Sequence, residues 1–133
     1  MKKTKSDLVR GWLEKARRDL IIAVSAQSSS EPFTDMICFH AQQSAEKCLK
    51  AYLIWNDIRF PKTHSIEDLV LLASEYHTDW MRLKDDAAAL TPYAVETRYP
   101  EFDEPSQEDA VEAIEVAERI QALVLNHLPK EAK

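Results

Sequence analysis

One stretch of the chain, residues 38–55, carries polar side chains at a spacing suited to phosphate binding or proton transfer. The stretch contains no Gly or Pro, which is typical of an α-helix. Side chains three and four positions apart lie on one helix face. Lysine supplies mobile ammonium donors, and histidine and glutamine can pair with base edges. The residues that share this face, here called the polar stripe, are His40, Gln43, Lys47 and Lys50.

The polar stripe has two interpretations. It can line a surface that binds phosphate or bases, or it can be a polar seam between packed helices, with Lys47 paired to Glu46 or another acid. The rest of this helix carries apolar residues on more than one side, as Ile37, Phe39 and Leu49 illustrate. A surface helix usually shows water one continuous polar face. We therefore expect this helix at the centre of a bundle or at a subunit contact.

A second group of candidates lies in the following loop, where Lys62 and His64 precede a helix that Ser65 is expected to cap. Helix N-termini favour anions, so Lys62 and His64 can bind phosphate there. The alternative is that His64 only packs the loop against the bundle. In-line attack by an RNA 2′-OH needs a general base and a cationic stabiliser. Arg59 and His64 form one pair that can supply both.

The third candidate is Arg98, which lies in an irregular segment between Tyr93 and Tyr99. An arginine beside aromatic rings can stack on a base or clamp a phosphate. Together with His40 it forms the second pair that a ribonuclease can use. The structural alternative is an ion pair that holds the loop, formed with Glu96, Glu101 or Asp103.

Composition limits the class of protein. The 133 residues suit one domain, 1–133, and 45% hydrophobic with 30% charged residues is typical of a globular protein. Residues 1–64 hold 11 Lys/Arg against 7 Asp/Glu, whereas residues 65–133 hold 6 against 16. We therefore expect an anion site to draw mainly on the first half. No cysteine or histidine spacing is typical of a metal site, and we expect neither metal nor cofactor.

The cellular compartment follows from two further patterns. No apolar run approaches the ~18 residues that a membrane span needs. Cys38 and Cys48 lie ten residues apart on one helix and cannot bridge to each other. They are interpreted as buried thiols of a reduced, cytoplasmic protein.

The elements that must position these residues are all helical. Capping sequences at Thr4–Asp7, Ser65–Asp68 and Ser106–Asp109 each precede an apolar periodic pattern. In the first helix, Lys15, Arg17, Arg18 and Asp19 are expected on the solvated side. The chain thus predicts an all-α bundle of five helices. They run from Thr4 to about Gln27, from near Phe33 or Thr34 to around Asn56, over a short segment after Ser65 with its apolar face at Ile66 to Ala73, from roughly Trp80 to Leu90, and from Ser106 to about His127.

Four segments together resemble a prokaryotic HEPN domain: Ala16-Arg17-Arg18-Asp19-Leu20, FHAQQSAEKCLKAYL, PKTHSIEDLV, and Tyr93 with Thr97-Arg98-Tyr99-Pro100. The resemblance implies an up-and-down four-helix bundle with an additional short helix, usually dimeric. It also implies a role linked to nucleotides or RNA. Small members commonly accompany a minimal nucleotidyltransferase, and some such pairs are toxin–antitoxin systems.

Other branches of the family are metal-independent ribonucleases with an Arg-x4–6-His motif near the start of a late helix. Here no histidine follows Arg98 at that distance, and the match at Arg59 and His64 lies in an earlier loop. The leading hypothesis is therefore a homodimeric module that binds a nucleotide or RNA phosphate and acts with a nucleotidyltransferase. Its expected contacts are His40, Gln43, Lys47, Lys50, Lys62, His64, Arg98 and Tyr99. The alternatives are an endoribonuclease toxin and a purely structural dimerisation domain.

Overall fold

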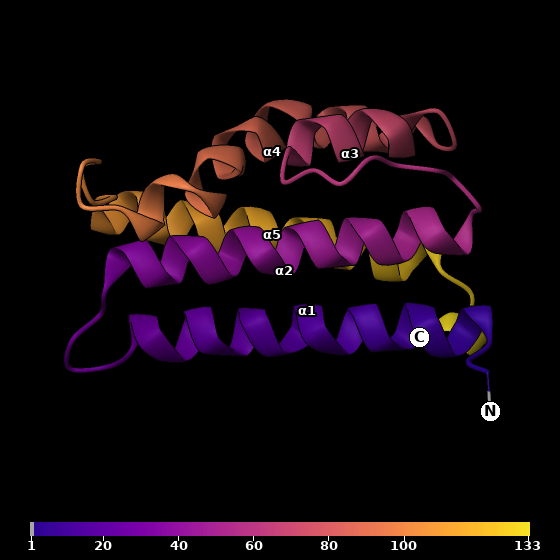
Figure 1. Cartoon of the computed structure of the whole chain (residues 1–133), viewed down its shortest axis with the longest axis horizontal. Coiled ribbons are helices and arrows are strands. Elements are labelled where there is room, and N and C mark those ends of the chain that lie inside the picture. The colour runs from indigo at the N-terminus through magenta and orange to yellow at the C-terminus, as the bar shows by residue number, and fades with distance from the viewer. Residues whose placement is uncertain (1) are drawn as a thin grey trace.

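Two long helices, α1 (Lys5–Gln27) and α2 (Thr34–Trp55), lie side by side and form the frame of the molecule (Figure 1). A computed structural model describes residues 2–133. After α2 come a short helix, α3 (Ile66–Ser74), a segmented arm, and a third long helix, α5 (Gln107–His127). The arm is built from η1 (Thr78–Leu83), α4 (Lys84–Leu90), η2 (Thr91–Ala94) and η3 (Glu96–Arg98), and a last 3₁₀ turn, η4, covers Lys130–Ala132.

The chain direction alternates along the bundle. In Figure 1, α1 and α2 run in opposite directions. The segmented arm runs opposite to α2, and α5 runs in the same direction as α2. The short helix α3 stands outside this alternation. Among residues 2–133 no strand is present, so the predicted all-α fold is confirmed.

Local sequence sets the helix starts as predicted. The Thr4 hydroxyl accepts from the Asp7 N–H, and the Asp7 carboxylate accepts from the Thr4 N–H. Ser106 and Asp109 form the same reciprocal pair before α5. Such capping boxes satisfy two otherwise unpaired donors at a helix start.

The expected helix from Trp80 to Leu90 is wrong in its first half. The structure has the tighter η1 there, and α4 begins only at Lys84. The His77 side chain caps η1 by accepting from the Asp79 N–H, which starts the segment earlier than the apolar pattern indicates. Pro92 has no N–H to continue the ladder of α4, and 3₁₀ turns follow.

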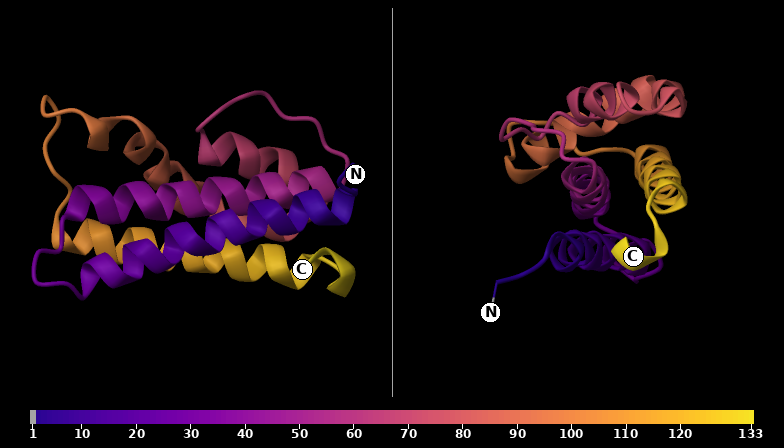
Figure 2. Two further views of the ribbon diagram at one scale, coloured as in Figure 1. Left: turned by 60° about the horizontal axis from the view of Figure 1, so that its bottom comes forward. Right: turned by 90° about the vertical axis from the view of Figure 1, so that its right-hand side faces the viewer.

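The second helix is the centre of the packing. Seen end-on in Figure 2, α2 lies between α1, α5 and the layer formed by α3 and the segmented arm. The prediction that this helix is covered on more than one side is confirmed. Its buried residues are Ile37, Cys38, Ala41, Gln42, Ser44, Ala45, Glu46, Cys48, Leu49, Ala51, Tyr52 and Leu53. Within the described chain, no helix has the length and apolar character needed to cross a bilayer.

Candidate functional site

Asp19 of α1 connects two members of the polar stripe. The Nδ1–H of His40 donates to Asp19 Oδ1 at 2.9 Å, and Lys47 Nζ donates to Oδ2 at 2.6 Å. We call these three residues the Asp19 cluster. Asp19 is only 8% exposed, so its expected place on the solvated side of the first helix is wrong. The α1 face that packs on α2 is wide enough to include it, and two α2 side chains compensate its buried charge.

A second buried carboxylate, Glu46, anchors the other half of the stripe. Lys50 Nζ donates to Glu46 Oε2 at 3.1 Å, and the Nδ1–H of His64 donates to Oε1 at 2.8 Å. Gln42 donates to the same Oε1 and to the His64 carbonyl, which fixes the loop to α2. These four residues are the Glu46 cluster. Buried charges are tolerated when they are paired in this way.

Most of the polar stripe therefore already has partners. Lys50 is also enclosed by aromatic rings, with Nζ 6.0 Å from the Trp12 centroid and 5.8 Å from the Phe60 centroid. Gln43 donates to Gln42 at 2.7 Å. These contacts are those of a polar seam between packed elements, and the predicted acid partner of Lys47 is Asp19 rather than Glu46.

His64 differs from the rest of the Glu46 cluster because 55% of its side chain is exposed. A carboxylate that accepts from Nδ1–H leaves the lone pair on Nε2, which is the form of imidazole that can take a proton. Lys62 and Arg59 in the same loop are exposed. Between residues 2 and 133 neither of them has an ion-pair partner, and no hydrogen bond joins Arg59 to His64.

Arg98, at the end of η3, is exposed and lies over the ring of Phe39 of α2, with Cζ 5.2 Å from the centroid. The Phe39 ring in turn meets the His40 ring edge-on at 5.3 Å. Within the described chain no carboxylate lies within ion-pair distance of Arg98, so the alternative pairs with Glu96, Glu101 and Asp103 do not form. Tyr99 beside it is half exposed.

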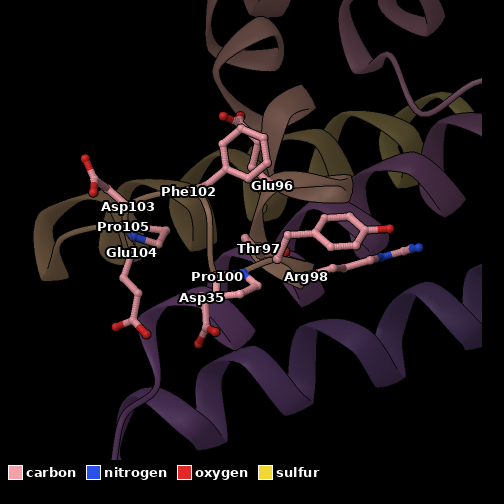
Figure 3. A pocket seen from close by; sticks show the side chains of 10 residues that line it. Asp35, Glu96, Thr97, Arg98, Pro100, Phe102, Asp103, Glu104 and Pro105 are labelled. Carbon is pink, nitrogen blue, oxygen red and sulfur yellow. The ribbon is translucent and has the colours of Figure 1, made fainter.

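A surface hollow of about 380 Å³ adjoins Arg98 (Figure 3). In this view the Arg98 side chain extends away from Asp35, Asp103 and Glu104, so its guanidinium points out of the hollow. The acidic lining would repel a phosphate, whereas on α2 the Arg98 guanidinium lies over the aromatic ring of Phe39. The hollow is lined by Asp35, Glu96, Thr97, Arg98, Tyr99, Pro100, Phe102, Asp103, Glu104 and Pro105.

The sequence analysis found the donors of the site but did not predict how Asp19 and Glu46 pair with them. Glu46 lies four positions before Lys50, a spacing that stacks acid and base on a helix, and this signal predicts their pairing. Asp19 lies three positions after Ala16, at core spacing, which indicates its buried face. The first signal is local to α2, whereas the pairing of Asp19 with α2 depends on which helices face each other, and that information is absent from the local pattern.

Comparisons with known proteins agree with this architecture. The family profile described as "HEPN domain" matches residues 9–128. The structure of TT1696 from Thermus thermophilus superposes with a TM-score of 0.79 at 31% identity, over 90% of this chain and 98% of that one. ST0689, described as an archaeal HEPN homologue, gives a TM-score of 0.69 at 29% identity, over 95% and 98% of the two chains. No curated protein matches the chain. This chain belongs to the HEPN family.

Proposed function

We propose that this HEPN domain binds the phosphate of a nucleotide or of RNA, with Arg98 as its principal contact. The observation that carries the proposal is which of the candidate cations already have a carboxylate partner. Lys47 and Lys50 are tied to buried carboxylates, whereas Arg98 is exposed, has no carboxylate partner within residues 2–133, and lies over Phe39. An arginine held this way can give two parallel N–H donors to a phosphate.

The surroundings of Arg98 suit a nucleotide better than a bare anion. The half-exposed Tyr99 offers a ring face on which a base can stack, while Phe39 holds the Arg98 guanidinium. His40 follows Phe39 on α2 and keeps its Nδ1 on Asp19. In this proposal His40, Gln43, Lys47 and Lys50 shape and support the surface, while Arg98 makes the direct contact. Lys62 and His64 form a second contact point for a longer RNA.

The proposal extends to partners. Five large apolar side chains are exposed where α1 ends and α2 begins, namely Ile21, Ile22, Val24, Phe33 and Met36. Large exposed apolar patches are typical of a protein contact, and we infer that these side chains contribute to one. We assign this surface to a second copy of the chain. We also infer that the dimer acts with a minimal nucleotidyltransferase, in a pair of the kind that includes toxin–antitoxin systems.

The test is RNA binding, measured by fluorescence anisotropy with a short labelled single-stranded RNA and by calorimetry with GTP and ATP. Arg98→Ala is expected to weaken binding about tenfold, as removal of a bidentate charged contact does. Arg119→Ala is the matched control, because Arg119 is also exposed but lies on α5 and pairs with Asp86. Equal affinities for the two variants would overturn the assignment of Arg98.

A second candidate function, metal-independent RNA cleavage, is favoured by one specific observation. Glu46 and Asp19 each accept from the Nδ1–H of a histidine, and His64 is open to solvent. This is how a general base is oriented. The candidate pairs are Arg59 with His64 and Arg98 with His40. Gel analysis of the RNA after incubation distinguishes binding from cleavage. Cleavage by the parent chain that disappears in His64→Ala or His40→Ala would support the ribonuclease.

The same assays also test the third possibility, a domain that serves only in assembly. RNA that stays intact and unbound, together with a stable dimer in light scattering, would indicate that role.

A further inference from the structure

Three potential ligand atoms meet where the turn after α3 lies beside the end of α5. They come from His77 and Asp79 at the start of η1 and from His127, the last residue of α5. The turn after α3 and the end of α5 lie at the same end of the molecule in Figure 1. One donor atom from each residue lies within 4.8 Å of the others.

The distances match those of a bound transition metal. His77 Nδ1 lies 3.4 Å from Asp79 Oδ2, and His127 Nε2 lies 3.6 Å from the same oxygen. Zinc bonds of about 2.0–2.1 Å in a tetrahedral arrangement place neighbouring ligand atoms about 3.3–3.4 Å apart. Two edges of the tetrahedron are therefore almost preformed, and the third closes with a small movement of the exposed His77 ring.

His127 supplies an independent observation. Its Nε2 is buried and, across residues 2–133, has no hydrogen-bond partner. Buried polar atoms normally have partners, and each exception calls for an explanation. The ring is held by aromatic neighbours, with centroids 4.2 Å from His77 and 6.4 Å from both Tyr52 and Trp80. Its nitrogen is thus directed at Asp79 by packing rather than by a hydrogen bond.

The other two ligands need only a small rearrangement to bind a metal. His77 Nδ1 accepts from the Asp79 N–H at 3.2 Å, so its lone pair is present but engaged, and metal binding replaces this capping hydrogen bond as the His77 ring turns. Asp79 Oδ1 accepts from Arg82 at 2.7 Å, which leaves Oδ2 turned toward the histidines. Arginine here orients the carboxylate, as outer partners of metal ligands commonly do.

We propose that His77, Asp79 and His127 bind a divalent transition-metal ion of the zinc class. Two imidazoles and one carboxylate suit zinc, and three protein ligands leave a further position for water. The ion ties η1 to the end of α5, two segments that are separated by about 50 residues in the chain. The exposed His77 and the half-buried Asp79 leave an entry path.

The test uses the full chain stripped with a chelator and then titrated with Zn²⁺ in competition with a chromophoric chelator. We expect one ion per chain and a higher unfolding temperature with zinc, because binding to the native state alone stabilises it. Cobalt substitution should give the intense visible bands of a tetrahedral site. His77→Ala and Asp79→Asn should abolish both effects.

The controls separate this site from adventitious binding. His64→Gln and Asp85→Asn remove an exposed histidine and an exposed carboxylate elsewhere and should leave zinc binding unchanged. His127 packs between aromatic rings, so His127→Gln can disturb the fold. Its circular dichroism is therefore compared with that of the conservative Asp79→Asn variant, to separate loss of fold from loss of zinc binding. No binding at submillimolar zinc, or the same affinity in His77→Ala and Asp79→Asn as in the parent chain, would overturn the proposal.

Discussion

Replacing Asp19 by alanine tests whether the Asp19 cluster holds α1 to α2. The change leaves Lys47 and His40 without their shared acceptor. Removing one partner of a buried ion pair costs about 3–5 kcal/mol. Lys47 and His40 keep 25% and 19% of their side chains exposed, so water recovers part of the loss. We expect the free energy of unfolding to fall by about 2–3 kcal/mol.

The same magnitude can be expressed as a temperature. An unfolding entropy of about 2.1 cal/mol/K per residue, applied to this chain, makes 2–3 kcal/mol equal to a drop of about 7–11 °C. Thermal and urea unfolding followed by circular dichroism measure both quantities. Asp103→Ala, which removes an exposed loop carboxylate, is the matched control and should leave stability within about 0.5 kcal/mol.

A double-mutant cycle isolates the interaction itself. Asp19→Ala and Lys47→Ala should be non-additive, with a coupling energy of about 1–3 kcal/mol, because the two residues share one buried contact. Additive effects, or an Asp19→Ala shift no larger than that of Asp103→Ala, would refute the reasoning that the buried carboxylate joins the two helices.

Three further outcomes are expected. Burial raises the pKa of the Cys38 and Cys48 thiols to about 12, so above pH 9 the unfolded chain loses protons that the folded chain keeps. Stability should then fall with rising pH by up to about 1.4 kcal/mol per pH unit per thiol, and Cys48→Ala should lessen this slope in urea unfolding. For the same reason, a thiol reagent at pH 8 should label neither cysteine until denaturant is added, and immediate labelling would contradict their burial. Ser106→Ala should lower the free energy of unfolding by about 1 kcal/mol through loss of the α5 cap, whereas Ser106→Asn should preserve it.

Local features of the fold were predictable from the sequence. Thr4, Ser65 and Ser106 cap helices as expected, because capping depends only on residues three positions apart. The central place of α2 follows from its apolar residues on several sides. The tight η1 could not be predicted, because its start is set by the His77 cap rather than by an apolar pattern.

The parts of the site that depend on contacts between distant segments could not be predicted from the sequence. The partners of Asp19, His40 and Lys47, belong to another helix, so the pattern of its own helix could not reveal them. His77 and His127 meet only because the end of α5 returns to the turn after α3. Arg98 was predictable as a candidate from its aromatic neighbours, but its lack of a carboxylate partner within the described chain required the structure.

The most direct test of the central claim is a nuclear magnetic resonance titration of the side-chain Nε–Hε signal of Arg98 with short single-stranded RNA. If Arg98 contacts phosphate, its Nε–Hε signal and the backbone amide of Phe39 should shift together and saturate, while the Nε–Hε signal of Arg119 stays unchanged. Saturable shifts confined to other residues, or none at millimolar RNA phosphate, would contradict the proposed phosphate-binding site.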